Sequence, residues 1–312
     1  MIFTKEIEAS IIHDYLQGYN TVQIAKKWNT YNTSIRRVLL KNNVKIRSNA
    51  EACTNIKECP FKDNDEKSEY FLGLLLTDGC ITRRTKNSAT ISLSLKDKDL
   101  MMQFQNFICP SNNICEVYQK KYNTYMYQSS TRSKIIADWL DCKGNFYNKS
   151  YDCDIYIPLT SHILRGIFDG DGYCMTRNKG NTFCYGICGK SKIFLEKIQQ
   201  YLAKQNITFN LHFRSNLYYL ECTKTVEVVK FYNLIYTEAH IYLARKYVKG
   251  HLFLETLREK FSKFKERDAS PNPEPSRNKS NCLINKNNGK FIMEGAETIM
   301  RLLNLDTGME NG

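Results

Sequence analysis

The sequence lacks the features that would place a chain in a membrane or send it across one. Its apolar runs all fall far short of the roughly 20 residues that span a bilayer. The first residues, MIFTKEIEASIIHDY, contain no basic stretch followed by an apolar one, so no secretory signal is indicated. We therefore expect a soluble intracellular protein without a membrane partner, in the cytoplasm, the nucleus or an organelle.

Patterns typical of compact metal and disulfide sites are missing as well. The 12 cysteines include no CxxC, and the tightest pairs are Cys53 with Cys59 and Cys184 with Cys188. Without a secretory signal, scattered cysteines indicate reduced thiols, and a structural zinc site is the alternative. The histidines, at positions 13, 162, 212, 240 and 251, lack the tight spacing of a histidine-based metal site.

Acidic residues are outnumbered, with 32 Asp and Glu against 45 Lys and Arg, which gives a formal charge of +13. Excess positive charge together with 12% aromatic residues suits a polyanionic partner, nucleic acid before others. Solubility charge spread evenly over the surface is the alternative. The length of 312 residues and the hydrophobic content of 42% allow one large domain or two to three small ones.

Residues 1–50 are predicted to form a small all-α DNA-binding domain. Helical spacing occurs over residues 5–17, from Thr21 in TVQIAKKWN, with Val22 inward, and in TSIRRVLLKNN, with Thr33 as its N-cap. The pattern indicates a helix-turn-helix whose third helix is basic, and an ordinary three-helix bundle is the alternative. The tail VKIRSNAEA would follow the DNA backbone or enter a minor groove. The expected contacts are Ser34, Arg36, Arg37, Lys41, Lys45 and Arg47.

Two segments are predicted to lie outside the folded domains. Residues 51–68 are polar and aperiodic, which is typical of a linker. Residues 262–312 include KERDASPNPEPSRNKSN, rich in Pro, Ser and Asn, so we expect a disordered tail with a short helix at EGAETIMRLLNL.

Residues 69–261 repeat one pattern, in 69–160 and again in 161–261. In each copy an apolar helix precedes a β-hairpin, a helix, a second hairpin and a final helix, so the fold class is α+β with two αββαββα halves and antiparallel sheets. Alternation in ATISLSLK and ITFNLHFR gives each sheet one apolar face against helices, with Phe213 expected on that face, and one polar face that is free.

The apolar helix of each copy ends in the same motif. Residues 70–79 read YFLGLLLTDG and residues 163–172 read ILRGIFDGDG, so both fit GxxxxDG. Small residues let two helices pack at short distance, which assigns Gly73 and Gly166 to a helix interface. The pair would then carry Asp78 and Asp171 side by side, an arrangement that favours a hard cation between them. For a single copy, an aspartate in a helix-terminal turn before glycine would be the ordinary interpretation.

Two GxxxxDG motifs in this context resemble the LAGLIDADG homing endonucleases over residues 69–261, and a preceding helix-turn-helix is also met in that family. The resemblance implies a monomer whose pseudo-twofold-related halves form a saddle on DNA. It further implies cleavage of both strands at a long recognition site, with Mg²⁺ or Mn²⁺ bound by Asp78 and Asp171 and by the carbonyls of Thr77 and Gly170. Asp169, opposite Leu76 in the first copy, is interpreted as non-catalytic.

Basic residues that assist catalysis in the family have only weak counterparts here. Aligning STRSKIIADWL with CTKTVEVVKFY places Arg132 opposite Lys224, and ordinary surface charges are equally compatible with both. The polar sheet faces would read DNA in the major groove. Their candidate contacts are Arg83, Arg84, Lys86, Lys120, Lys121, Arg177, Lys179 and Arg214.

Two other functions fit the same scaffold. One is an RNA maturase that binds its intron RNA, and the other is a DNA-binding regulator that does not cleave. The paired aspartates favour the nuclease. The ends of the chain show no splicing junctions, so we expect a free-standing or intron-encoded enzyme, and abundant Asn, Lys, Ile and Tyr hint at an AT-rich genome.

Overall fold

The computed structural model describes residues 3–17, 19–46, 56, 58–85, 88–120, 123–147, 149–177, 182–268, 298–299 and 301–303. Within these residues the buried apolar side chains form two separate cores. The smaller core belongs to residues before 47, and the larger one extends from Ile56 to Leu303.

The smaller core is built by three helices. They are α1 (Lys5–Leu16), α2 (Thr21–Lys27) and α3 (Asn32–Lys41). Each contributes an apolar residue that is almost fully buried, namely Ile11, Ile24 and Ile35. A capping box starts α2, because Asn20 accepts from its first turn while the Gln23 side chain accepts from the Asn20 backbone. These residues therefore fold as a helical unit of their own.

Two details of these helices differ from the expectation. Val22 is 62% exposed, because α2 is only seven residues long and its buried stripe consists of Ile24 and Ala25. Thr33 is not the N-cap of α3. That helix begins at Asn32 and is preceded by Tyr31, whose side chain makes no capping hydrogen bond.

The segment predicted as a linker contributes to the larger core. Phe61 is fully buried and its ring lies 4.9 Å from that of Phe107 and 5.4 Å from that of Trp139. Helix α5 then begins at Glu66, capped by the Asp65 side chain, which accepts from the Ser68 amide at 2.7 Å. The folded domain therefore includes residues 56 and 58–68, and the rest of the expected linker lies outside the described residues.

The first unit of the larger domain has the order αββαββα and one antiparallel sheet, β1-β2-β4-β3. Its elements are α5 (Glu66–Thr77), β1 (Gly79–Thr85), β2 (Ser88–Leu95), α6 (Lys98–Ile108), β3 (Cys115–Gln119), β4 (Thr124–Arg132) and α7 (Lys134–Asp141). A connection follows with β5 (Gly144–Asn145), α8 (Lys149–Asp152) and β6 (Asp154–Ile155).

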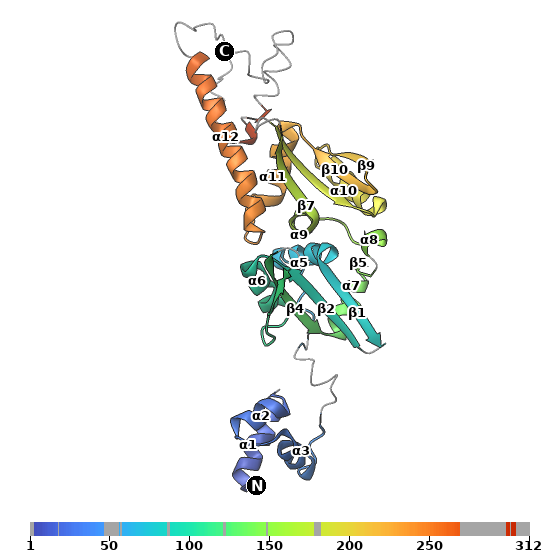
Figure 1. Ribbon diagram of the computed structural model, residues 1–312, viewed down its shortest axis with the longest axis vertical. Helices are drawn as coiled ribbons and strands as arrows, with labels where there is room; N and C mark the ends of the chain where they lie inside the picture. Colours follow the sequence, from blue (N-terminus) through green and yellow to red (C-terminus); the bar gives the residue numbers. More distant parts are fainter. Residues whose placement is uncertain are drawn as a thin grey trace.

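The second unit repeats this order, and its sheet has the matching arrangement β7-β8-β10-β9. Its elements are α9 (Ser161–Asp171), β7 (Gly172–Arg177), β8 (Thr182–Gly189), α10 (Lys192–Lys204), β9 (Asn210–Arg214), β10 (Leu217–Cys222) and α11 (Thr225–Tyr236). Figure 1 shows α5 and α9 in contact between the two sheets, and the mixed α+β class with antiparallel sheets is as predicted.

Strand alternation is confirmed in the first sheet and partly wrong in the second. Strand β2 alternates between buried and half-buried residues along its whole length. In ITFNLHFR, Ile207 and Phe209 are buried but precede β9, and Phe213 within that strand is 62% exposed. Phe213 lies next to the hairpin turn and packs across it on Tyr218, with ring centroids 4.7 Å apart, instead of reaching the helices.

Helix α12 (Ala244–Asp268) runs beyond residue 261, so residues 262–268 belong to a helix and not to the expected tail. Ile299 and Leu303 of the predicted C-terminal helix are buried in the larger core, and Asn233 Nδ2 donates to the Leu302 carbonyl at 2.9 Å. The remainder of that tail lies outside the described residues. No helix in the described part of the chain is long and apolar enough to cross a membrane.

Candidate active site

Helices α5 and α9 touch backbone to backbone. A Cβ atom added to Gly73 would lie 2.1 Å from the Ile163 carbonyl oxygen, and one added to Gly166 would lie 2.0 Å from the Tyr70 carbonyl oxygen. Both separations are far below van der Waals contact. The two glycines of the repeated motif are therefore what allows this helix pair to form.

The close contact brings the ends of α5 and α9 together. Asp78 follows the last turn of α5, and Asp171 is the last residue of α9. Both residues are exposed at the surface, but partial desolvation of the carboxyl group raises the pKa of Asp171 to about 6, and the negative charge of Asp78 contributes to that rise. Partial desolvation also raises the pKa of Asp78, against the opposing charges of Lys149, Lys246 and Arg245. Two carboxylates thus interact unfavourably across the helix interface.

Two lysines that the sequence interpretation missed bind the ends of these helices. Lys149 Nζ donates to the carbonyls of Leu75 at 2.9 Å and Thr77 at 2.7 Å, at the end of α5. Lys246 Nζ does the same at the end of α9. Its acceptors are the carbonyls of Phe168 at 2.6 Å, Asp169 at 2.8 Å, Gly170 at 3.3 Å and Gly172. Each motif helix therefore ends at an ammonium group that satisfies its last carbonyls and interacts favourably with the negative end of its dipole.

The surroundings of these lysines favour loss of a proton. Burial lowers the pKa of Lys246 to about 8, although Asp169 and Asp78 oppose that change. The pKa of Lys149 is also lowered, again mainly by burial. The site therefore has two lysines beside its two aspartates, and burial weakens the hold of both lysines on their protons.

The catalytic role expected for Arg132 and Lys224 remains a prediction. Both are exposed, and the cations that influence the pKa of Asp78 and Asp171 are Lys149 and Lys246 together with Arg245. Their assumed equivalence fails. Lys224 is the N-cap of α11, but the N-cap of α7 is Ser133.

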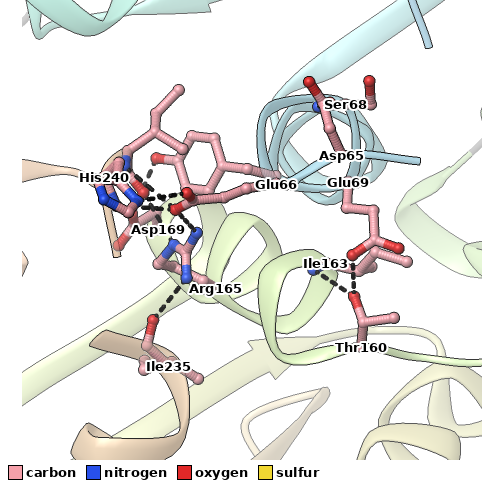
Figure 2. Close-up of polar contacts among 12 residues, drawn as sticks. Asp65, Glu66, Ser68, Glu69, Thr160, Ile163, Arg165, Asp169, Ile235 and His240 are labelled. Carbon is pink, nitrogen blue, oxygen red and sulfur yellow. Dashed lines mark hydrogen bonds and ion pairs between the residues drawn. The ribbon is translucent and has the colours of Figure 1, made fainter. Parts of the chain in front are cut away.

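A buried polar network holds the segment that leads to Lys246. The Arg165 side chain is only 1% exposed, and it donates to the carbonyls of Ile235 at 2.9 Å and Ile241 at 2.8 Å while pairing with Glu66 (Figure 2). Glu66 also accepts from the His240 amide at 2.9 Å. Residues 235–241 are thereby tied to both α9 and α5.

Asp169 extends this network toward α12. Its buried carboxylate accepts from the Tyr70 hydroxyl at 2.8 Å, the Tyr236 hydroxyl at 2.8 Å and the Leu243 amide at 2.7 Å. These three hydrogen bonds give the Asp169 carboxylate a structural role. They also hold the backbone at Leu243, three residues before Lys246. In the first unit the corresponding position is the apolar Leu76, so the two lysines are positioned differently.

A cavity of about 190 Å³ opens beside Asp78. Lys96 and Arg245 are among its lining residues, and Arg245 pairs with Asp97 at 3.4 Å. The lining also includes Asp97 and Asp169, so the wall of the cavity contains three carboxyl groups and two cations, and Lys96 is the cation there that can contact an anionic group without leaving an ion pair with Asp97. Among the described residues, no three or more His, Cys, Asp or Glu side chains gather as a metal cage. A cation here would therefore depend on the two aspartates, water and substrate oxygens.

The predicted DNA contacts of the N-terminal helices are only partly available. Arg36 and Arg37 are exposed on α3. Lys41 pairs with Glu8, with Nζ and Oε1 2.8 Å apart, and Ser34 is half-buried. The exposed face of α3 is therefore basic, but part of its charge is neutralised within the domain.

Arg83 lies on the wrong face of the first sheet for DNA. It shares the helix-facing side of β1 with buried Ile81, and it pairs with Asp138 at 2.7 Å and Asp141 at 2.6 Å on α7. Strand alternation from Ile81 would have predicted this. The other candidates that the structure describes are exposed, namely Lys45, Lys120 and Arg214. The backbone or side chain lies outside the described residues for Arg47, Arg84, Lys86, Lys121, Arg177 and Lys179.

Replacing Lys246 with methionine keeps the apolar stem but removes the ammonium group. The carbonyls at the end of α9 then lose their donor in a buried site, so the free energy of unfolding is expected to fall by about 2–4 kcal/mol. Urea denaturation measures this. Lys249, exposed on the next turn of α12, donates to the Cys174 carbonyl at 2.6 Å and provides the matched control. Its methionine variant is expected to lose less than about 1 kcal/mol, and equal losses would contradict this role of Lys246.

Part of this chain matches a known protein family. Residues 160–236 match the family model described as a LAGLIDADG-like domain. No curated protein matches the sequence. Similar solved structures include the homing endonuclease I-WcaI bound to its DNA recognition sequence, with 16% identity, a TM-score of 0.45 and coverage of 62% of this chain and 91% of that one.

Two further structures are similar at the same level. Mesophilic variants of the homing endonuclease I-DmoI share 18% identity at a TM-score of 0.42, over 60% of this chain and 97% of theirs. The N-terminal LAGLIDADG domain of WhiA shares 15% identity at a TM-score of 0.38, over 62% of this chain and 95% of that one. Asp171 and the strands of the second unit lie within residues 160–236, the part of this chain that matches the LAGLIDADG-like domain.

Proposed function

We propose that this chain is a site-specific endonuclease that cuts both strands of duplex DNA with a divalent metal, Mg²⁺ or Mn²⁺, held by Asp78 and Asp171. The observation that carries the proposal is the backbone contact of α5 and α9 through Gly73 and Gly166, which brings two unfavourably interacting carboxylates together. A merely structural helix pair has no need of such a charge arrangement.

The donor set fits a hard divalent cation. Each carboxylate raises the free energy of the other, and a cation between them removes that cost. The carbonyls of Thr77 and Gly170 already accept hydrogen bonds from Lys149 and Lys246, so a metal on either oxygen would face a nearby ammonium. We therefore assign the carboxylates as the principal ligands. A bound metal would polarise the scissile phosphate and lower the pKa of an attacking water.

The remaining residues of the site would act on charge and position. Lys149 and Lys246 lie near both aspartates and can stabilise the negative charge that grows on the phosphate during attack. Lys96 can bind the neighbouring phosphate in the cavity beside Asp78. The polar sheet faces would follow the major groove, and residues 1–50 would act as a helix-turn-helix that extends the contact.

Cleavage of a randomised duplex library in Mg²⁺, with parallel reactions in EDTA and with the Asp78→Asn, Asp171→Asn double variant, tests the proposal. We expect one long site to be cut by the wild-type chain with metal and by neither control. Tight binding of duplex DNA without any cleavage would replace the proposal with a DNA-binding regulator. Preference for folded intron RNA over duplex DNA would replace it with a maturase.

Metal binding should also depend on pH through Asp171. Its pKa is raised from 3.8 to about 6, so the folded chain binds a proton more tightly than the unfolded chain in that window. The contribution of Asp171 to the free energy of unfolding therefore declines as pH rises toward 6. Above that pH, a metal that binds the carboxylate form offsets the lost stability.

Saturating Mg²⁺ is accordingly expected to raise the melting temperature by about 3 °C near pH 7.5 and by less than about 1 °C near pH 5. Differential scanning fluorimetry measures both shifts. The double Asn variant serves as the control and should show no metal-dependent shift at either pH. An equal shift in that variant would place the metal elsewhere.

A further inference from the structure

The polar face of the second sheet contains a nearly buried acid. Strand register places Tyr173, Gly186 and Glu221 in one row across β7, β8 and β10. Glu221 is only 6% exposed, and its Oε1 accepts from the Tyr173 hydroxyl and from Arg214 Nη2, the latter at 2.7 Å. A carboxylate on a face that is to meet a polyanion is costly unless it has a specific partner.

Gly186 makes this row possible. A Cβ atom at this position would lie 2.3 Å from Tyr173 Cζ, so the tyrosine ring lies directly over the β8 backbone. The ring thereby reaches across the strand, and its hydroxyl meets Glu221 on the far side. The contact depends on two residue choices, a glycine and a tyrosine, which indicates a built arrangement and not a chance surface ion pair.

Arg214 is held in place but remains accessible. Its guanidinium carbon lies 3.9 Å from the centroid of the Tyr219 ring, and one of its nitrogens donates to Glu221. The side chain is nevertheless 46% exposed. The residue also directly precedes the two-residue turn Ser215–Asn216, whose positive φ angles of 49° and 60° close the β9–β10 hairpin tightly. Stacking, ion pair and rigid hairpin together restrict the guanidinium plane.

The first sheet has no such arrangement at the matching positions. Gly79 pairs with Leu93 there as Gly172 pairs with Ile187 in the second sheet, which aligns the two registers. The equivalent row consists of Cys80, Ser92 and Ser130. These side chains are small, so the restrained arginine belongs to one half of the molecule.

We propose that Arg214 reads a guanine in the half of the DNA site that the second sheet covers, with Glu221, Tyr173 and Tyr219 as the residues that position it. The inference rests on the proposed function, because it assumes that this face meets duplex DNA. A guanidinium matches the O6 and N7 acceptors of guanine in the major groove with two parallel hydrogen bonds. A side chain that is already fixed loses less conformational entropy on binding than a free one.

Selection of bound sequences from a randomised duplex library tests this with the full-length chain. The wild type is compared with Arg214→Gln, Arg214→Lys and Glu221→Gln, and with Lys204→Gln as a control on the helical side. Lys204 is exposed at the end of α10, and its variant removes the same charge as Arg214→Gln. Because every base occurs at every position of the library, the selected sequences themselves define the site.

The wild type is expected to prefer guanine by about tenfold or more at one position in only one half of the site. Both Arg214 variants should reduce that preference to about twofold or less while leaving the other positions unchanged. Glu221→Gln keeps the size of the side chain and should weaken the same preference without removing it. Lys204→Gln should reproduce the wild-type profile.

Other outcomes separate the failure of this inference from failure of the proposed function. A long selected site with a profile that is the same in wild type and Arg214→Gln would overturn the inference alone. Uniformly weaker binding of Arg214→Gln, with the salt slope reduced by about one, would identify a phosphate contact and also overturn it. Failure of the wild type to select any duplex sequence would remove the proposed function together with it.

Discussion

Asp171→Asn is expected to slow double-strand cleavage by at least about 1000-fold while duplex binding is retained. The asparagine amide has nearly the size of the carboxylate but no charge, so it is a poor ligand for a divalent cation. Removing a negative charge that faces the phosphates should leave affinity unchanged or raise it. Asp78→Asn should have an effect of the same order, because both carboxylates lie at one helix interface.

Single-turnover cleavage with strand-resolved products, together with binding in the absence of cleavage, measures the two effects separately. Asp99→Asn is the matched control, since Asp99 is an exposed carboxylate in the first turn of α6. It should cleave at the wild-type rate. Wild-type cleavage by either Asp78→Asn or Asp171→Asn would exclude the proposed metal role of that residue. Loss of binding in parallel with cleavage would instead indicate a folding defect.

The elements that could be predicted are those whose signals are local. Alternation along ATISLSLK gave the correct buried face of β2, because a strand in a one-sided sheet repeats every two residues. The GxxxxDG motifs predicted the helix contact for a similar reason, since a glycine without a side chain, within a helix of bulky apolar residues, lets a second helix approach the backbone. Gly73 and Gly166 are indeed where the two backbones meet.

Residues that act across long sequence distances could not be predicted in this way. Lys149 binds carbonyls more than 70 positions earlier in the chain, at Leu75 and Thr77, and no pattern around NKSYD indicates that. Lys246 is equally unmarked at the start of α12. One feature of the sequence could have indicated the pair, because Lys149 and Lys246 follow the last helix of their units at a similar interval. That similarity can be recognised only after the two units have been aligned by their strand register.

Two other predictions were wrong because they were based on residue type alone and not on position in a helix or strand. Phe61 stands among polar residues, so its segment was predicted as a linker, yet one aromatic ring between Phe107 and Trp139 is enough to anchor it. Arg83 was assigned to DNA because of its charge, although its position two residues after Ile81 places it on the buried face of β1. For Arg83, strand periodicity was a more reliable guide than charge.

Gly166→Ala is expected to lower the free energy of unfolding by at least about 3 kcal/mol. The new Cβ atom would lie 2.0 Å from the Tyr70 carbonyl oxygen and 2.8 Å from the Leu74 amide nitrogen. Both neighbours are backbone atoms of a helix, so neither can move aside without displacing α5. Gly73→Ala meets the Ile163 carbonyl oxygen at 2.1 Å and should behave alike.

The sign of the change in the free energy of unfolding shows whether the two helix backbones are in contact at Gly166. Within an isolated helix, replacing glycine with alanine stabilises by about 1 kcal/mol, because alanine loses less backbone entropy on folding. A net loss therefore requires that the helix contact cost more than this gain. Gly189→Ala provides the control, since a Cβ atom there would meet nothing within 4 Å, and its change should stay within about 0.5 kcal/mol.

Urea denaturation of Gly166→Ala, Gly73→Ala and Gly189→Ala tests the backbone contact of α5 and α9. If Gly166→Ala were as stable as Gly189→Ala, α5 and α9 would not meet backbone to backbone, and nothing would hold Asp78 and Asp171 together. If it is destabilised as expected, the helix pair is both the main contact between the two units and the support of the carboxylates. Spreading the pair should then reduce cleavage even under conditions where the variant is folded, because the two metal ligands would move apart.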